Sequence, residues 1–246
     1  SAGVITLDAG GIIKTINTSA AQMLGLRVDD VLNHSYEHLL GGQFRGLARE
    51  IMDSTEKLLD QIERVMFNNV VFKARSKGLG IITPDMVDPY GIVGPNARAC
   101  GFARDLRKDE PYLVYDQLDF EVITGTASDA YERAWVRQQE MHQCIDLIRQ
   151  MLERTPDSGP FQARMPNVLH WKIPPGETYL KAECTRGEYG YYLVTDGSEY
   201  LRRVHVRGPS YTHAIAVMER LVVGTNIADI AGLMVSLHTY PPEIER

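Results

Sequence analysis

Cysteine is scarce in this sequence, and no two cysteines lie close together. The 246 residues contain three, at positions 100, 144 and 184. The chain therefore lacks the Cys-x-x-Cys pairs that hold zinc, nickel or an iron–sulfur cluster. The odd number and wide spacing favour free thiols in a reducing compartment over a disulfide framework. We expect this chain to bind no metal ion and no cluster of its own.

Long apolar runs and an excess of positive charge are also missing. The longest candidate run, Ile227–Leu237, is interrupted by Asp229 and is too short to cross a bilayer. No basic signal segment precedes the first expected strand, so any membrane association is expected to be peripheral, through partner subunits. The net charge of −6 implies no basic face and argues against nucleic acid. No Gly-rich dinucleotide fingerprint occurs.

Residues 1–42 differ in pattern from the rest of the chain. Residues 3–17 predict a strand, a tight turn and a second strand, followed by a short helix that Gly25 ends. This order resembles the first half of a PAS sensor domain, and the resemblance is carried by Asp8, Gly11, Asn17 and Ala20. The later strands of such a domain are missing, so we expect a PAS-like fragment without a cofactor. A hairpin and helix beside another domain is an equal alternative.

Residues 43–246 predict a helix-rich α+β domain with a small antiparallel meander. Apolar residues at three-, four- and seven-residue intervals predict an amphipathic helix from Gln43 to about Asn68. The other elements expected are a long helix at about 128–154, strands at 178–184, 190–195 and 201–207, and helices at about 211–223 and 225–237. Turns are expected at Arg186-Gly187 and Asp196-Gly197.

A dense series of motifs fills this second segment. It begins with Gly94-Pro-Asn-Ala-Arg-Ala-Cys-Gly101 and Asp105-Leu-Arg-Lys108. It continues with Asp129-x-Tyr131-x-Arg133-x-x-x-Arg137-x-x-Glu140, Arg186-Gly-Glu-x-Gly190 and Ile227-Ala-Asp229. In this order the motifs resemble the D-type subunit of the respiratory NADH:quinone oxidoreductase (complex I), a relative of the [NiFe]-hydrogenase large subunits. The resemblance extends from about Glu50 to Leu237, the C-terminal half of such a domain.

The resemblance implies a protein that shapes the cavity for quinone reduction and is not catalytic alone. In this family's quinone-reducing branch the protein binds no metal. Quinone accepts electrons from an iron–sulfur cluster on a neighbouring subunit, while FMN and NADH bind to further partner subunits. The implied location is peripheral, at the cytoplasmic face of the bacterial inner membrane. Two other interpretations stay open: a non-catalytic PAS-linked signalling or assembly protein, and a degenerate or joined fragment without activity.

The C-terminal tail separates this chain from the hydrogenases. The resemblance places Tyr240 and Glu243 where membrane-bound [NiFe] hydrogenases carry a nickel-ligating Cys-x-x-Cys pair, and a phenol and a carboxylate do not replace thiolates. His238 and Tyr240 are instead candidates for hydrogen bonds to a quinone carbonyl. Alternatively, Pro241-Pro242 directs the tail to the surface, where both side chains would be solvated.

Three charged residues in one motif are candidates for a subunit interface: Asp105, Arg107 and Lys108. They predict either a buried ion network or a solvated surface cluster, and the resemblance favours the interface. Charge reversal at Arg107 and Lys108 is then expected to weaken association and leave the fold intact. Arg186 and Glu188, in the loop 185–190, are further interface candidates, with a plain β-turn as the alternative. Arg133 and Arg137 predict charge pairs along one helix face. His142 is expected to be a core residue.

Overall fold

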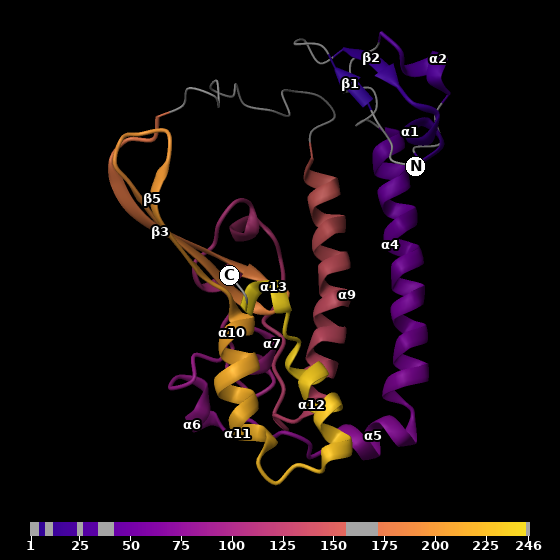
Figure 1. Cartoon of the computed structure of the whole chain (residues 1–246). Coiled ribbons are helices and arrows are strands. Elements are labelled where there is room, and N and C mark those ends of the chain that lie inside the picture. Colours follow the sequence, from indigo (N-terminus) through magenta and orange to yellow (C-terminus); the bar gives the residue numbers. More distant parts are fainter. Residues whose placement is uncertain (1–4, 8–11, 24–26, 34–41, 156–171, 245–246) are drawn as a thin grey trace. The chain divides into compact units, whose positions relative to one another are not determined.

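The structure, a computed structural model, describes residues 5–7, 12–23, 27–33, 42–155 and 172–244. The chain divides into two compact units, residues 1–58 with 148–164, and residues 59–147 with 165–246. The two longest helices, α4 (Gly42–Ile62) and α9 (Ala130–Arg154), each run from one unit into the other (Figure 1). Both confirm long helices predicted from apolar periodicity. Of the described helices, none is long and apolar enough to span a membrane.

The first unit begins with a small hairpin and a short helix. β1 (Ile5–Leu7) pairs antiparallel with β2 (Ile13–Ile16), and α1 (Thr18–Met23) follows. The Asn17 side chain caps α1 by accepting a hydrogen bond of 2.8 Å from the Ala20 amide. A second short helix, α2 (Val28–Val31), completes this part. The predicted hairpin and helix are confirmed, whereas Asp8 and Gly11 of the PAS-like pattern lie outside the described residues.

Helices α4 and α9 are joined by ion pairs within the first unit. Arg149 in α9 donates to Asp53 Oδ1 at 3.0 Å and to Glu56 Oε2 at 2.7 Å in α4. In the second unit the same two helices are linked by Gln138, whose Nε2 donates to the Leu59 carbonyl at 2.9 Å. His142 follows one turn after Gln138, and its Nε2 lies 3.3 Å from the Gln138 amide nitrogen. His142 is only partly buried, so it makes a structural contact but is not the core residue that the sequence predicts.

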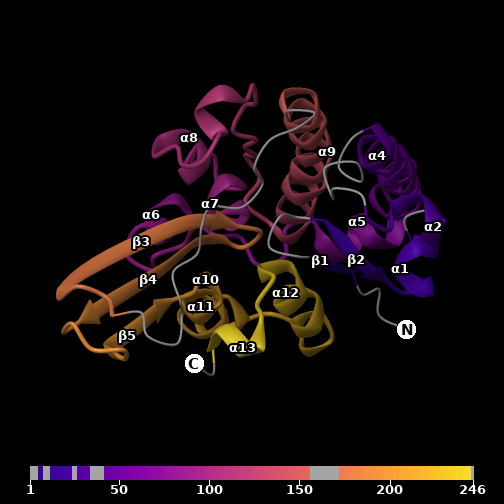
Figure 2. The same ribbon diagram turned by 90° about the horizontal axis from the view of Figure 1, so that it is seen from above.

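The second unit contains the predicted meander. β3 (Gly176–Cys184), β4 (Gly187–Thr195) and β5 (Leu201–Arg207) form an antiparallel sheet in that order. The turn between β3 and β4 is tight, because Cys184 pairs with Gly187. Helix α8 (Leu106–Asp109) contacts β3 and helix α10 (Pro209–Thr212) contacts β4, so these strands lie between them (Figure 2).

The second unit also contains a series of short helices. They are η1 (Glu63–Phe67), α5 (Val70–Ser76), α6 (Pro84–Val87), α7 (Pro95–Arg98), η2 (Tyr115–Gln117), η3 (His213–Val217), α11 (Met218–Val222), η4 (Ile227–Asp229), α12 (Ile230–Leu237) and α13 (Pro241–Ile244). Elements η1, α10 to α11, and η4 with α12 fall in the predicted helical ranges. Helices α5 to α8 and α13 were not predicted.

A core of apolar side chains fixes where the C-terminal tail leaves helix α12. Ile82, Val87, Val217, Leu233 and Leu237 are buried in one cluster. Burying each such side chain contributes about 1.5–3 kcal/mol. The last of them, Leu237, precedes His238, the C-cap of α12, which has a left-handed backbone with φ of 54°. The core therefore anchors the helix from which the residues of the tail project.

Candidate functional site

Two glycines bring the β3–β4 turn against the loop before α7. Gly94 has φ of +64° and Gly187 has φ of +125°. A Cβ atom on Gly94 would lie 2.4 Å from Gly187 Cα, and one on Gly187 would lie 2.6 Å from Val93 Cγ2. Only glycine fits such an approach. The close approach of Gly187 is thus made to another segment of the same chain.

Arg98 is the centre of a buried ion network. Its side chain is only 2% exposed. Its Nε donates to Glu140 Oε1 at 2.6 Å, its Nη1 donates to Glu183 Oε1 at 2.9 Å, and Asp105 Oδ2 lies 3.7 Å from Nη1. Burial raises the pKa of Glu183, although Arg98 opposes the shift. The network thus joins α7, α9, β3 and the cap of α8.

The interface candidates Asp105 and Arg107 extend this network. Asp105 caps α8, accepting from the Arg107 amide and Nε at 3.0 Å each and from Arg107 Nη2 at 2.6 Å. Burial tends to raise the pKa of Asp105, but bonds to Arg107 and the charges of Arg107 and Arg98 lower it below its ordinary value. Lys108 donates to the Phe120 carbonyl at 2.9 Å.

Asp105 and Arg107 therefore form an internal ion pair, whereas Lys108 beside them is exposed to solvent. A role in subunit contact stays a prediction. The structure changes one part of that expectation, since reversing Arg107 would place two carboxylates together in a buried position. We now expect this reversal to destabilise the fold.

Arg133 and Arg137 do not form the predicted charge pairs with neighbours on their own helix. Arg133 is fully buried and donates to the Gly80 and Ser128 carbonyls at 2.8 Å each and to Ser236 Oγ at 2.7 Å. Glu140 instead holds Arg98, and the Asp129 carboxylate accepts from backbone amides. The prediction was wrong because these side chains point into the unit, where loop carbonyls and the last turn of α12 supply acceptors.

Arg137 reaches from α9 to the end of α12. Its Nη1 donates to the Ser236 carbonyl at 2.8 Å and to the Arg133 carbonyl at 3.1 Å. Its Nη2 donates to Asn96 Oδ1 at 2.7 Å. Burial, reinforced by the charge of Arg133, lowers the pKa of Arg137 to about 9. At neutral pH it is still a cation.

Asn96 links Arg137 to a buried histidine. Its Nδ2 lies 3.1 Å from His213 Nδ1, and the Val93 amide donates to His213 Nε2 at 3.4 Å. Burial and the nearby arginines lower the pKa of His213 to about 3, so this imidazole is neutral. Neither Asn96 nor His213 was predicted to contribute, although Asn96 belongs to the Gly-Pro-Asn motif.

The tail folds back onto the β3–β4 turn. Glu243 is 6% exposed and accepts from Arg186 Nε at 2.8 Å and from the Ser210 hydroxyl. Burial tends to raise the pKa of Glu243, but the bonds from Arg186 and Ser210 lower it. Tyr240 places its ring 5.0 Å from the Arg186 guanidinium, and its amide donates to Ser210 Oγ at 3.0 Å. Arg186, an interface candidate, is thus held within the chain.

The C-terminal tail, which contains two prolines, is only partly exposed at the surface. Pro241 and Pro242 begin helix α13, consistent with proline's preference for the first helical turn. Helix α13 contacts α10, and Glu243 on it is buried, whereas Tyr240 just before it is 49% exposed. The remaining interface candidate, Glu188, lies 3.3 Å from Arg207 Nη1 and 3.9 Å from Lys181 Nζ.

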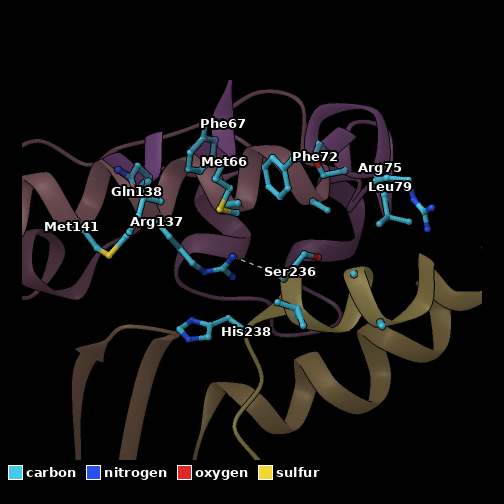
Figure 3. A pocket seen from close by; sticks show the side chains of 17 residues that line it. Met66, Phe67, Phe72, Arg75, Leu79, Arg137, Gln138, Met141, Ser236 and His238 are labelled. Carbon is cyan, nitrogen blue, oxygen red and sulfur yellow. Dashed lines mark hydrogen bonds between the residues drawn. The ribbon is translucent and has the colours of Figure 1, made fainter. Parts of the chain in front are cut away.

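A cavity of about 560 Å³ opens beside α12 (Figure 3). Most of its wall is apolar, and its polar lining residues are Arg75, Ser76, Arg137, Gln138, Ser236 and His238. The apolar side chains of its wall include Ile62, Met66, Phe67, Phe72, Leu79, Met141 and Val235. A second cavity, of about 790 Å³, borders the Arg98 network. Arg137, Met141 and His238 line both.

His238 is thus placed at a cavity wall, as its candidacy requires, but Tyr240 lines neither of these two cavities. Partial burial and the charges of Arg137 and Arg186 lower the pKa of His238, so its ring is neutral at neutral pH. A neutral imidazole has one N–H donor and one acceptor nitrogen. The role of Tyr240 in a quinone cavity stays a prediction.

Metal binding has little to support it in the described part of the chain. There, no three or more His, Cys, Asp or Glu side chains gather in a way that could hold an ion. Cys100, Cys144 and Cys184 are free cysteines. The residues that this part of the chain brings together are instead arginines, carboxylates and a neutral histidine.

Most of the chain is similar to known proteins. The profile of the family described as "Respiratory-chain NADH dehydrogenase, 49 Kd subunit" matches these residues. The D-type subunit of NADH-quinone oxidoreductase from Syntrophobacter fumaroxidans is 40% identical over 205 residues, which are 83% of this chain and 54% of the relative. The D-type subunit of F(420)H(2) dehydrogenase from Methanosarcina mazei is 35% identical over 202 residues, 80% of this chain and 53% of the relative.

A solved structure supports the same relationship. It is described as the membrane-bound sulfane sulfur reductase (MBS), an archaeal respiratory membrane complex. A chain in it matches with a TM-score of 0.80 and 37% identity, covering 84% of this chain and 56% of that one. The chain spans about half the length of the curated relatives that it matches.

The profile match begins at residue 40, near the change of pattern expected after residue 42. The PAS likeness of residues 1–42 receives no support from these comparisons and stays a prediction. The resemblance carried by the motifs of residues 50–237 is confirmed at the level of the family. On the profile match and the relatives together, the chain belongs to the family of the 49 kDa subunit of respiratory NADH dehydrogenase.

Proposed function

We propose that this chain forms part of the wall of a quinone-reduction cavity in a complex I-type respiratory assembly. The observation that carries the proposal is the cavity of about 560 Å³ beside α12, which is apolar along most of its wall and has Arg137 and His238 among its few polar lining residues. Binding sites for small molecules combine apolar walls with a few placed polar groups. A quinone has an apolar ring and two carbonyl acceptors, which fits this division.

The partners of the chain follow from the same proposal. An iron–sulfur cluster on a neighbouring subunit would deliver electrons to the quinone, and FMN and NADH would bind to further subunits. The chain would be peripheral at the cytoplasmic face of the bacterial inner membrane and would catalyse nothing alone. The names of its relatives include NADH, F420H2 and sulfane sulfur. NADH as donor and quinone as acceptor are therefore what the experiment must test.

His238 is the residue most directly involved in this proposal. Its ring would donate one hydrogen bond to a quinone carbonyl, with a net contribution of about 0.5–1.5 kcal/mol. The bond would strengthen as negative charge develops on the oxygen, which accelerates reduction. Tyr240 would have a lesser role, because its ring rests on Arg186.

The test compares His238→Ala and Tyr240→Phe in the assembled complex. Two exposed residues of the same types on β5 and just before it supply matched controls, His205→Ala and Tyr200→Phe. We expect His238→Ala to reduce the quinone reductase rate by about tenfold, the effect of roughly 1.4 kcal/mol. Reduction of the partner's cluster by NADH should not change, because that step precedes the quinone.

Unchanged quinone affinity and rate in the His238→Ala, Tyr240→Phe double variant would exclude the tail from the cavity. A rate loss in the His205→Ala control as large as that in His238→Ala would show that the effect is not specific to this cavity. If the assembled complex reduces no quinone while its clusters are still reduced, the acceptor named here is wrong.

A further inference from the structure

Arg137 is a buried cation without an ion-pair partner among the residues that the structure describes. Its bonds go to neutral oxygens, the carbonyls of Ser236 and Arg133 and the amide of Asn96. In the described part of the chain, no carboxylate lies within salt-bridge distance of it. The charge of Glu140 acts on Arg137, but the Glu140 Oε1 atom accepts its hydrogen bond from Arg98. Arg133, one helical turn away, is a second cation, and its hydrogen bonds to the described residues go to neutral oxygens.

One donor of Arg137 is also unused. Its Nε is buried and has no hydrogen-bond partner among the described residues. An unsatisfied buried donor costs about 1–3 kcal/mol, and more when the group is charged. A catalytic role or a bound ion is among the explanations for such a group. Within the described part of the protein, the Arg137 guanidinium therefore has no ion-pair partner, and its Nε donor has no acceptor.

The position of this charge is at the junction of the two cavities. Figure 3 shows the Arg137 side chain extending from α9 toward Ser236, with the His238 ring close by. Arg137 lines both cavities, and most of the first cavity's wall is apolar. In a site with little water, a cation attracts an anion more strongly than it would at the surface.

We propose that Arg137 is the anion-binding residue of this cavity, and that it binds a negatively charged oxygen on the ring of a quinone. This rests on the proposed function, and it deepens it by naming the charge state of the ligand that the site prefers. The oxygen is either a deprotonated ring hydroxyl or a carbonyl oxygen that has gained charge on reduction. The lowered pKa of His238 agrees with this field of positive charge.

A purely structural role is the competing explanation. Arg137 also caps α12, since the Ser236 carbonyl is one of the last in that helix. Loss of a cap would lower stability and would weaken every ligand equally. An anion-binding role instead changes the ratio of affinities for a charged and an uncharged ligand of the same shape.

The experiment therefore measures that ratio on the full chain by titration calorimetry. The probes are 2-hydroxy-1,4-naphthoquinone, an anion at neutral pH, and 1,4-naphthoquinone, which is neutral and nearly the same size. We expect the unaltered chain to bind the anion about tenfold more tightly or better, as one charge-assisted hydrogen bond predicts. Arg137→Met should bring the ratio to within about twofold, whereas Arg137→Lys should retain a clear preference.

The control is Arg104→Met, which removes an exposed arginine that is paired with Asp88 and lines neither cavity. Its ratio should equal that of the unaltered chain. Equal affinity for both probes in the unaltered chain, or a preference that survives in Arg137→Met, overturns the inference and leaves the quinone cavity standing. Failure of both probes to bind refutes the proposed function and the inference together. If Arg137→Met does not fold, the ratio of the two affinities in the unaltered chain and in Arg137→Lys still tests the inference.

Discussion

Replacing Arg98 by methionine would leave three carboxyl groups around a buried position without their shared cation. Methionine matches the length of the arginine stem and fills the apolar space, but it donates no hydrogen bonds. Glu140 and Glu183 would lose bonds of 2.6 and 2.9 Å, and the Arg104 carbonyl would lose a third, of 2.9 Å. Asp105 would keep Arg107.

The expected destabilisation is large because the site is buried. Breaking a buried ion pair by removing one partner costs about 3–5 kcal/mol. For a unit of this size each kcal/mol lowers Tm by about 2–4 °C, so Tm should fall by roughly 6–20 °C. The matched control is Arg104→Met, whose exposed side chain pairs with one exposed carboxylate. Its Tm should stay within the scatter of replicate melts.

The assay is thermal and urea unfolding of the variant between pH 5 and pH 8. Burial already raises the pKa of Glu183 while Arg98 opposes the shift, so removing Arg98 raises that pKa further. The pKa of an unfolded glutamate is about 4.3. When a carboxyl group has a higher pKa in the folded protein, the free energy of unfolding falls as pH rises from the unfolded to the folded pKa. The Arg98→Met variant should therefore be more stable at pH 5 than at pH 8, relative to the unaltered chain.

Two results would refute this reasoning. One is a loss of less than about 1 kcal/mol, typical of surface ion pairs. The other is a large loss with no dependence on pH above pH 5, because the carboxylates would then have found other partners. Asp105 does not confuse the assay: its folded pKa is lowered, so its contribution is lost only as pH falls below about 4.

Three further predictions concern other parts of the second unit and its chemistry. Arg107→Glu should lower Tm strongly, because the new carboxylate would face the buried Asp105. Lys108→Glu loses one hydrogen bond to a carbonyl and should change Tm little. Pull-down of the partner protein with Lys108→Glu then tests the interface in a folded chain. Gly94→Ala should destabilise the fold by several kcal/mol because its Cβ would overlap Gly187, while Gly78→Ala, also at positive φ but with open space around it, should cost about 1 kcal/mol; urea unfolding of both variants compares them. Metal analysis of the purified chain should find no stoichiometric nickel and no iron–sulfur absorbance after reconstitution, since paired thiolates are missing.

The elements with a clear local signal were predictable. Helices α4 and α9 have long apolar stripes, and the meander has turn residues such as Gly187 and Gly197 between its strands. The short helices were not, because four to seven residues carry too little periodicity. Their beginnings depend on single caps, such as Asn69 Oδ1, which accepts from the Val71 amide at 2.8 Å at the start of α5.

The site was less predictable, because its contacts join residues far apart in the sequence. The spacing of Arg133, Arg137 and Glu140 on α9 indicates only that they share a helix. It does not indicate that Arg98 forms ion pairs with Glu140 and Glu183. Nor does it indicate that Ser236 of α12 accepts hydrogen bonds from Arg133 and Arg137. Likewise, Pro241 suggested a turn toward solvent, whereas Glu243 is buried and accepts a hydrogen bond from Arg186.

The meeting of Gly94 and Gly187 has a consequence for how the chain folds. Strands β3, β4 and β5 are neighbours in sequence, and hairpins form in about 1–10 μs. Joining the β3–β4 turn to the Gly94 loop closes a chain segment of roughly 90 residues, whose entropy cost must be met before the contact stabilises anything. The sheet is therefore expected to form early and dock late. A variant that weakens the docking, such as Gly94→Ala, should then speed unfolding far more than it slows folding.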